Sequence, residues 1–200
     1  MTDLFEEKAK DWDTNDMVTK LSGAIGKSIL TQIELNSAWH VMDFGAGTGL
    51  ITSQIAPHVN KITAIDVSQS MLEQLIAKDG LKDKVDILCQ NILDCPTGEN
   101  YDLIMSAMAM HHVEDTNKML EQFSAHLKKG GQVALADLDF EDGTFHPEGV
   151  EGVYHDGFKR VEFQTMLENH GFSNVNFFTA HTAQKETGAY PIFLAVATKA

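Results

Sequence analysis

Residues 41–49 read V-M-D-F-G-A-G-T-G, and this short stretch decides the fold class. Trp39 to Phe44 is a mostly apolar run, typical of a buried strand, and it leads directly into three glycines at alternate positions. Glycines in such a turn let the backbone bend sharply and approach a ligand without interference from a Cβ atom. Helical spacing of apolar residues follows until Pro57. The stretch therefore predicts a strand, a ligand-binding turn and a helix whose N-terminus faces the ligand.

The same alternation of strand and helix continues along the chain. Apolar runs at 61–66, 85–89, 101–106 and 132–136 predict further strands. Helical spacing predicts helices at 21–33, 69–80, 115–129 and 158–169. The last two strands, expected at 175–178 and 192–198, are joined by a short polar loop, which favours an antiparallel hairpin at the sheet edge. The pattern as a whole predicts an α/β fold with a doubly wound, mostly parallel sheet of seven strands.

Length and composition indicate one globular domain over residues 1–200. The chain is 43% hydrophobic and 22% charged, which excludes a disordered or fibrous protein. The apolar run Ile192 to Ala197 is too short to span a bilayer, and the first residues lack the apolar stretch of a secretory signal. We therefore expect a cytoplasmic protein with no membrane partner.

Charge and cysteine content exclude further classes. Asp and Glu number 29 against 15 Lys and Arg, and a formal net charge of −14 without any basic cluster disfavours nucleic acid as a partner. Cys89 and Cys95 fit neither a disulfide framework nor a metal motif, so we expect reduced thiols, with Cys89 in the core. The acids and histidines of 137–155 match no metal-binding spacing, so we expect no metal.

An acid at the end of the second predicted strand completes the candidate ligand site. Asp66 lies 17 residues after Gly49, where doubly wound folds bind a ribose, and its carboxylate can accept hydrogen bonds from both hydroxyls of an adenosine. The third glycine comes one residue earlier than in the G-x-G-x-x-G pattern of dinucleotide sites. A dinucleotide-dependent oxidoreductase and a purely structural glycine turn are therefore the less favoured alternatives.

Four stretches together resemble the class I S-adenosylmethionine-dependent methyltransferase family. They are D-F-G-A-G-T-G at 43–49, I-D-V-S-Q-S-M at 65–71, Q-N-I at 90–92 and S-A-M-A-M-H-H-V at 106–113. The resemblance spans nearly the whole chain and implies a Rossmann-like sheet of seven strands whose last strand is antiparallel. It also implies S-adenosyl-L-methionine as the methyl donor and S-adenosyl-L-homocysteine as the product.

The family's motifs imply roles for residues near the methionine part of the donor. Gly45, Ala46 and Gly47 would pack against it, and Asp43 would help hold its ammonium group. Ser106 would lie beneath the sulfonium.

Other motif positions imply contacts with the adenosine part of the donor. Asp66 would bind the ribose hydroxyls, while Val67 and Met71 would flank the adenine. Asn91 and Ile92 would lie beside the adenine amino group. Asn91 departs from the acid that the family often has there, but its side-chain carbonyl can accept a hydrogen bond from that group.

The N-terminal segment resembles the family's helical lid. On this resemblance, residues 1–36 form the lid and 37–200 the Rossmann-like core. Trp12, with Phe5 and Ala9, would fold over the donor and exclude water. The alternative is that Trp12 only packs the first helix onto the domain.

The methyl acceptor is expected to contact loops at the carboxyl ends of the strands. His112, beside His111, follows the fourth predicted strand, and a neutral imidazole can act as a base near neutral pH. His146 and His155 lie in the connection 137–158, which is dense in acids, histidines and aromatic residues. A third candidate is the loop expected at 179–190.

The leading function is therefore transfer of a methyl group to a small molecule, because a chain without an added domain leaves little room for recognising a macromolecule. The main alternative is a protein that binds the donor without turnover, as a sensor or partner subunit.

Overall fold

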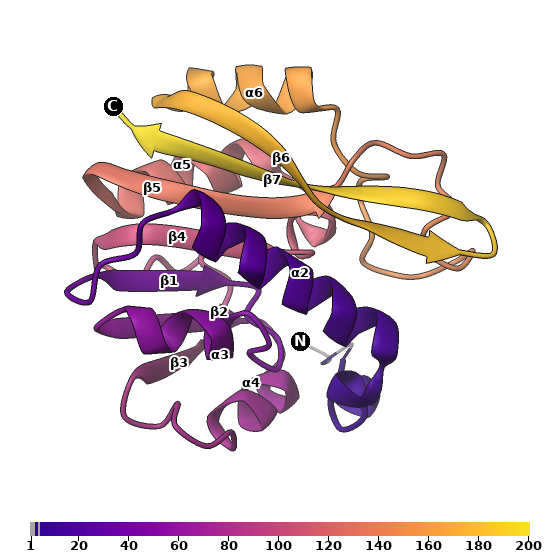
Figure 1. The fold of residues 1–200 in the computed structure, drawn as a ribbon, viewed down its shortest axis with the longest axis horizontal. Coiled ribbons are helices and arrows are strands. Elements are labelled where there is room, and N and C mark those ends of the chain that lie inside the picture. Colours follow the sequence, from indigo (N-terminus) through magenta and orange to yellow (C-terminus); the bar gives the residue numbers. More distant parts are fainter. Residues whose placement is uncertain (1–2, 4) are drawn as a thin grey trace.

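In the computed structural model, which describes Asp3 and residues 5–200, seven strands form one sheet in the order β3-β2-β1-β4-β5-β7-β6 (Figure 1). The strands are β1 (His40–Phe44), β2 (Lys61–Asp66), β3 (Val85–Cys89), β4 (Tyr101–Ala107), β5 (Leu127–Leu138), β6 (Phe172–Lys185) and β7 (Gly188–Lys199). Adjacent strands from β3 to β5 are parallel, whereas β7 is antiparallel to both β5 and β6. The predicted Rossmann-like sheet with its antiparallel last strand is confirmed.

Helices cover both faces of this sheet. They are α1 (Glu6–Ala9), α2 (Asp16–Gln32), α3 (Thr52–Ile55), α4 (Gln69–Ile76), α5 (Thr116–His126) and α6 (Arg160–Asn169), with 3₁₀ turns η1 (Trp12–Thr14), η2 (Ala56–His58) and η3 (Met110–His112). The N-cap predicted at Ser68 is confirmed, since its Oγ accepts a hydrogen bond from the Met71 N–H. Within the described residues, every helix is too short or too polar to cross a membrane.

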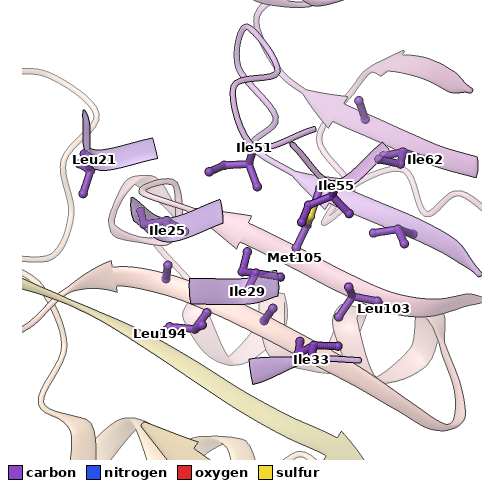
Figure 2. Close-up of a cluster of buried hydrophobic side chains, with 14 of the residues drawn as sticks. Leu21, Ile25, Ile29, Ile33, Ile51, Ile55, Ile62, Leu103, Met105 and Leu194 are labelled. Carbon is purple, nitrogen blue, oxygen red and sulfur yellow. The ribbon is translucent and has the colours of Figure 1, made fainter. Parts of the chain in front are cut away.

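Helix α2 buries its apolar stripe against one face of the sheet. Leu21, Ile25 and Ile29 recur every four residues, and Figure 2 shows this row facing Leu194 of the sheet. Ile25 and Ile29 are fully buried, so α2 is part of the main core. The expected lid of 1–36 therefore includes a helix that belongs to the core. Of its described residues, those before α2 are the ones that are left to cover a ligand.

A second core fills the opposite face. Helices α5 and α6 pack there through Phe123 and Phe163, which are fully buried. The two clusters alternate along each strand: Val41 belongs to the first and Met42 to the second. This alternation is what a sheet covered on both faces requires.

Two expectations about local structure were wrong. Helix α5 ends at His126 instead of residue 129, because Leu127 already pairs with Tyr101 of β4. The expected loop at 179–190 is mostly paired strand, with β6 and β7 in register up to Lys185 and Gly188. The helical segment expected until Pro57 is present as α3, of four residues, followed by η2.

The expectation for Cys89 was also wrong. It is exposed and not in the core, because β3 is an edge strand and this residue is its last one. Cys95 is also an exposed free thiol.

Candidate functional site

The glycine loop at 45–49 joins β1 to α3 and is held against the end of β2. The N–H groups of Gly45 and Ala46 donate to the Ile65 carbonyl at 2.9 and 3.1 Å. The loop's N–H groups thus serve mainly to fix its own shape. Because α3 has only four residues, its macrodipole contributes little to the electrostatic field at the loop.

The glycines of this loop differ in what surrounds them. A Cβ at Gly45 would lie 2.3 Å from the Ala109 Cβ, and one at Gly49 would lie 2.5 Å from the Leu75 Cγ. At Gly47, where φ is +53°, a Cβ would meet no atom within 4 Å. Gly45 and Gly49 therefore allow close packing within the protein, whereas Gly47 faces open space in which a ligand can approach the backbone.

Asp66 supports the loop at this open position. Its Oδ2 accepts a hydrogen bond from the Gly47 N–H at 2.8 Å, and its Oδ1 accepts one from the Ser68 N–H at 2.9 Å. A carboxylate can accept about four hydrogen bonds, so both oxygens keep capacity for two ligand hydroxyls. Burial raises the pKa of Asp66, although these hydrogen bonds act to lower it.

Asp43 is the second carboxyl group of the site. It is buried in β1, with 2% of its surface exposed, and the Thr52 hydroxyl donates to its Oδ2 at 2.5 Å. Burial raises its pKa to about 7; the Thr52 hydrogen bond lowers it and the nearby Asp66 charge raises it further. Such a group favours a cationic partner, because a positive charge would offset the cost of ionising it in a buried place.

The residues expected around the adenosine lie at the ends of β2 and β3. Val67 is 55% exposed, whereas Met71 and Ile92 are buried. Asn91 uses its Oδ1 to accept a hydrogen bond from the Leu93 N–H at 3.1 Å, which fixes the turn after β3. Val67 therefore offers an open apolar surface beside Asp66, and Asn91 keeps one lone pair for a further donor.

The N-terminal segment is tied to the glycine loop by Asp13. Its Oδ1 accepts a hydrogen bond from the Thr48 hydroxyl at 2.5 Å, and its Oδ2 pairs with the Lys78 ammonium at 2.6 Å. Sequence reasoning missed this link. Its one signal was the polar Thr48 inside the glycine motif, which needs a partner when buried.

Aromatic side chains connect the N-terminal segment to the histidines. The Phe5 ring packs edge-on against Trp12 and against His112, with ring centroids 6.0 Å apart in each pair. Phe5 thus joins Trp12 to the turn η3 that follows β4.

Three histidines gather where β4 and the loop after β5 meet. The ring of His111 lies 4.1 Å from that of His112 and 5.0 Å from that of His146, measured between centroids. The structure thus brings two predicted residues, His112 and His146, together with His111.

Asp137, the fully buried residue before the last of β5, holds His111. Its Oδ1 lies 2.7 Å from the His111 Nδ1 and also accepts from the Leu138 N–H, while its Oδ2 accepts from the N–H groups of Met110 and His111. Four donors around one carboxyl group match the capacity of an ionised carboxylate. The pairing of Asp137 with His111 was not predicted. The sequence feature that could have indicated it is that each of the two neighbouring parallel strands is followed by, or ends in, a polar residue.

Burial keeps the other two histidines neutral. The His112 Nδ1 lies 2.7 Å from the Gly152 carbonyl, and burial, with the nearby His111, lowers the pKa of His112. Burial lowers the pKa of His146 to about 4, and its histidine neighbours add to the effect. At neutral pH both rings therefore present lone pairs and not charges.

His155 is joined to this cluster by its backbone, since its N–H donates to the His111 carbonyl at 3.3 Å, but its side chain lines a separate groove. Its Nε2 is 2.9 Å from the Val113 carbonyl, and its ring packs against Phe158 in a groove of about 450 Å³ that also contains Phe140 and Tyr154. His146 instead lines a different cavity of about 620 Å³. Among the described residues, no group of three or more His, Cys, Asp or Glu is arranged to hold a metal ion.

Ser106 is the remaining residue that was predicted to contact the donor. It is buried at the end of β4, and its Oγ has no hydrogen-bond partner in the described structure.

Comparison with known proteins gives a consistent result. Residues 41–131 match a family described as "Methyltransferase domain". An uncharacterized methyltransferase of Bacillus thuringiensis is 29% identical over 188 residues, covering 84% of this chain and 88% of the relative.

Solved structures agree in fold. A chain from the complex between the Haloferax volcanii Trm112 methyltransferase activator and a methyltransferase matches with a TM-score of 0.81 and 18% identity, over 100% of this chain and 99% of that one. An S-adenosylmethionine-dependent methyltransferase of Aquifex aeolicus matches with a TM-score of 0.73 and 22% identity, over 98% of both chains. A Haemonchus contortus phosphoethanolamine N-methyltransferase in complex with S-adenosyl-L-methionine matches with 0.72 and 15% identity, over 98% of this chain and 60% of that one.

Proposed function

We propose that this chain is a class I S-adenosylmethionine-dependent methyltransferase, an enzyme that transfers a methyl group from S-adenosyl-L-methionine to a small molecule; the match of residues 41–131 to a methyltransferase domain and the 29% identical methyltransferase of Bacillus thuringiensis support this. The observation that carries the proposal is the open position at Gly47 next to the Asp66 carboxylate. The methionine part of S-adenosyl-L-methionine needs a backbone that it can approach without meeting a side chain. Its ribose needs a carboxylate nearby with lone pairs free to accept hydrogen bonds.

The donor supplies a methyl group already activated by a sulfonium, so the protein needs to bind, align and dehydrate the reactants. Asp43 would hold the ammonium, and Asp66 the ribose hydroxyls. Val67 would lie against the adenine. The full set of proposed donor-binding residues is Trp12, Asp43, Gly45, Ala46, Gly47, Asp66, Val67, Met71, Asn91, Ile92 and Ser106.

The buried carboxyl of Asp43 supports this assignment most directly. Its pKa of about 7 means that ionisation is unfavourable without a partner, and an ammonium group within reach would reverse that. A nicotinamide dinucleotide places its pyrophosphate at this kind of loop, and an anion beside Asp43 would be repelled.

We place the acceptor beside His112 and His146 at the carboxyl end of β4. The Phe5 and Trp12 rings cover the neighbouring region and would exclude water. We leave His155 out of this acceptor site, because its Nε2 lies 2.9 Å from the Val113 carbonyl and its side chain lines the separate groove. The acceptor that we propose is a small molecule of the cytoplasm, since a net charge of −14 disfavours a nucleic acid.

Calorimetric titration and a transfer assay test the proposal together. S-adenosyl-L-methionine should bind and should raise the Tm by about 5–10 °C at one hundred times its Kd, since that saturation adds about 2.7 kcal/mol to stability. Label from the methyl group should then appear in at least one compound of a polar metabolite extract. Binding of NAD and not of the methyl donor would contradict the proposal.

A second candidate function is donor binding without turnover, as a sensor or partner subunit. The match to a chain solved with a methyltransferase activator is the observation that favours it. Donor binding with no labelled product, in the presence and absence of other proteins from a cell extract, would support this alternative.

A further inference from the structure

Two buried imidazole nitrogens lack a hydrogen-bond partner among the residues that the structure describes. They are Nε2 of His111 and Nε2 of His146, in rings whose centroids are 5.0 Å apart. An unpaired buried polar atom is destabilising, so two of them in adjacent rings point to a ligand with hydrogen-bond donors.

The Asp137 carboxylate fixes the tautomer of His111. Both of its oxygens are already surrounded by N–H donors, so the His111 Nδ1 at 2.7 Å must carry the proton of that hydrogen bond. The lone pair of the neutral ring is then on Nε2, the atom without a partner. His111 therefore presents a base, and the carboxylate behind it stabilises the ring when that base takes up a proton.

Resting on the proposed methyl transfer, we infer that His111 Nε2 takes the proton of the acceptor, that Asp137 positions it, and that the acceptor is methylated at an O–H or N–H group. In this step the acceptor's oxygen or nitrogen forms the bond to the methyl carbon while the carbon–sulfur bond breaks. The electron pair of that bond stays on sulfur, and the acceptor's proton passes to His111 Nε2 and then to solvent.

The neighbouring groups distinguish His111 from the other two histidines. His146 is too weakly basic for this role, given its pKa of about 4, and His112 is held by a neutral carbonyl. The charged and titratable groups around His111 are Asp137 from β5 and the rings of His112 and His146, with Lys8 and Lys185 farther out. Among the described residues, Asp137 is the one carboxylate that pairs with any of the three rings.

The same geometry limits the acceptor. The His111 lone pair is on the buried Nε2, and the neutral His112 and His146 add no positive charge. A carboxylate or phosphate at the reacting position would be repelled, whereas a hydroxyl or an amine can donate to Nε2.

The tautomer can be measured without any acceptor. In protein labelled with ¹⁵N-histidine, long-range proton–nitrogen correlation spectra near pH 7 should show His111 protonated at Nδ1 and bare at Nε2. A proton on Nε2 would overturn the inference even if methyl transfer itself is established.

Kinetics test the role in transfer, with an acceptor found by the labelled-donor screen. His111→Asn should lower kcat at least about 100-fold, the usual contribution of a general base, while the affinity for S-adenosyl-L-methionine changes less than about twofold. Asp137→Asn should lower kcat and move the acid limb of the pH–rate profile to lower pH, and Asp137→Glu should restore part of the rate. His58→Asn, at an exposed position in η2, is the matched control and should change nothing.

The outcomes separate the two proposals. Failure of the wild-type protein to bind the donor would contradict the proposed function. Donor binding and transfer with an unchanged kcat in His111→Asn, or with methylation of a thioether or tertiary amine, would overturn this inference alone.

Discussion

At the scale of single residues, we expect a side chain added at Gly47 to lower the affinity for the donor more than one added at any other position of the loop. Gly47→Val would place a branched side chain in the open space beside Asp66 and should weaken donor binding at least about 100-fold by calorimetry. Its positive φ adds backbone strain of about 1–3 kcal/mol.

Gly80→Val controls for that strain. Gly80 also has a positive φ, and a Cβ there also meets no atom within 4 Å, but it lies in the turn after α4. Both variants should lose similar stability in urea unfolding, and only Gly47→Val should lose the donor. Normal affinity in Gly47→Val would place the donor elsewhere.

Asp43 predicts a pH dependence of stability. Its pKa is about 7 in the folded protein against 3.8 ordinarily, so between these values the folded state binds a proton that the unfolded chain has released. Proton binding by Asp43 therefore stabilises the folded state. This stabilisation is fully present below pH 4 and is lost as the pH rises to about 7.

Asp43→Asn removes that loss and should stabilise the donor-free protein at pH 8 by up to about 4 kcal/mol, with little effect at pH 4. Urea unfolding of both proteins from pH 4 to 8 measures it, with the exposed Asp16→Asn as control. The same substitution should weaken donor binding, since it removes the partner of the ammonium. A wild-type curve parallel to that of Asp43→Asn would show that Asp43 does not titrate in this range.

At the scale of elements, we expect the segment from Phe5 to Asn15 to cover the donor, and Asp13 links this segment to the glycine loop. Asp13→Ala removes both the hydrogen bond from Thr48 and the ion pair with Lys78. These contacts contribute about 0.5–1.5 kcal/mol, so the variant should bind the donor about 3- to 10-fold more weakly and expose 5–15 to limited proteolysis.

Asp16→Ala is the matched control, because it breaks only the exposed pair with Lys20 at 3.5 Å. It should leave donor affinity and proteolysis unchanged. Equal behaviour of the two variants would mean that the segment is not a cover for the donor.

At the scale of the whole molecule, the net charge of −14 opposes compaction. Raising NaCl from 0.05 to about 0.3 M at pH 7.5 should raise the Tm by a few degrees, because salt screens repulsion between the acids. Near pH 5, close to the isoelectric point of 4.9, the charge vanishes and so should the salt effect. Calorimetric scans at the two pH values measure this, and an equal response at both would point to ion binding instead of screening.

Much of the fold followed from local patterns in the sequence. The runs of Lys61 to Asp66 and Val85 to Cys89 gave strands with the predicted ends, because buried apolar runs between turn residues form strands wherever they lie. The start of α4 at Ser68 followed from capping chemistry, which is equally local. Predictions failed where the outcome depended on a partner distant in the sequence. Leu127 was expected in a helix but pairs with Tyr101 of β4. The mostly polar segment 180–185 was expected to be a loop but is a strand, because β7 pairs with it.

The candidate site divides in the same way. The sequence by itself determined the glycine loop and Asp66, since glycine's conformational freedom and a carboxylate at a strand end are properties of adjacent residues. Only the tertiary structure decided that Asp137 fixes the tautomer of His111, that His146 joins this pair, and that His155 does not. These groups are far apart in the chain, and the free energy that makes them interact comes from burial and hydrogen bonds that exist only once β4, β5 and the loop at 139–159 have packed together.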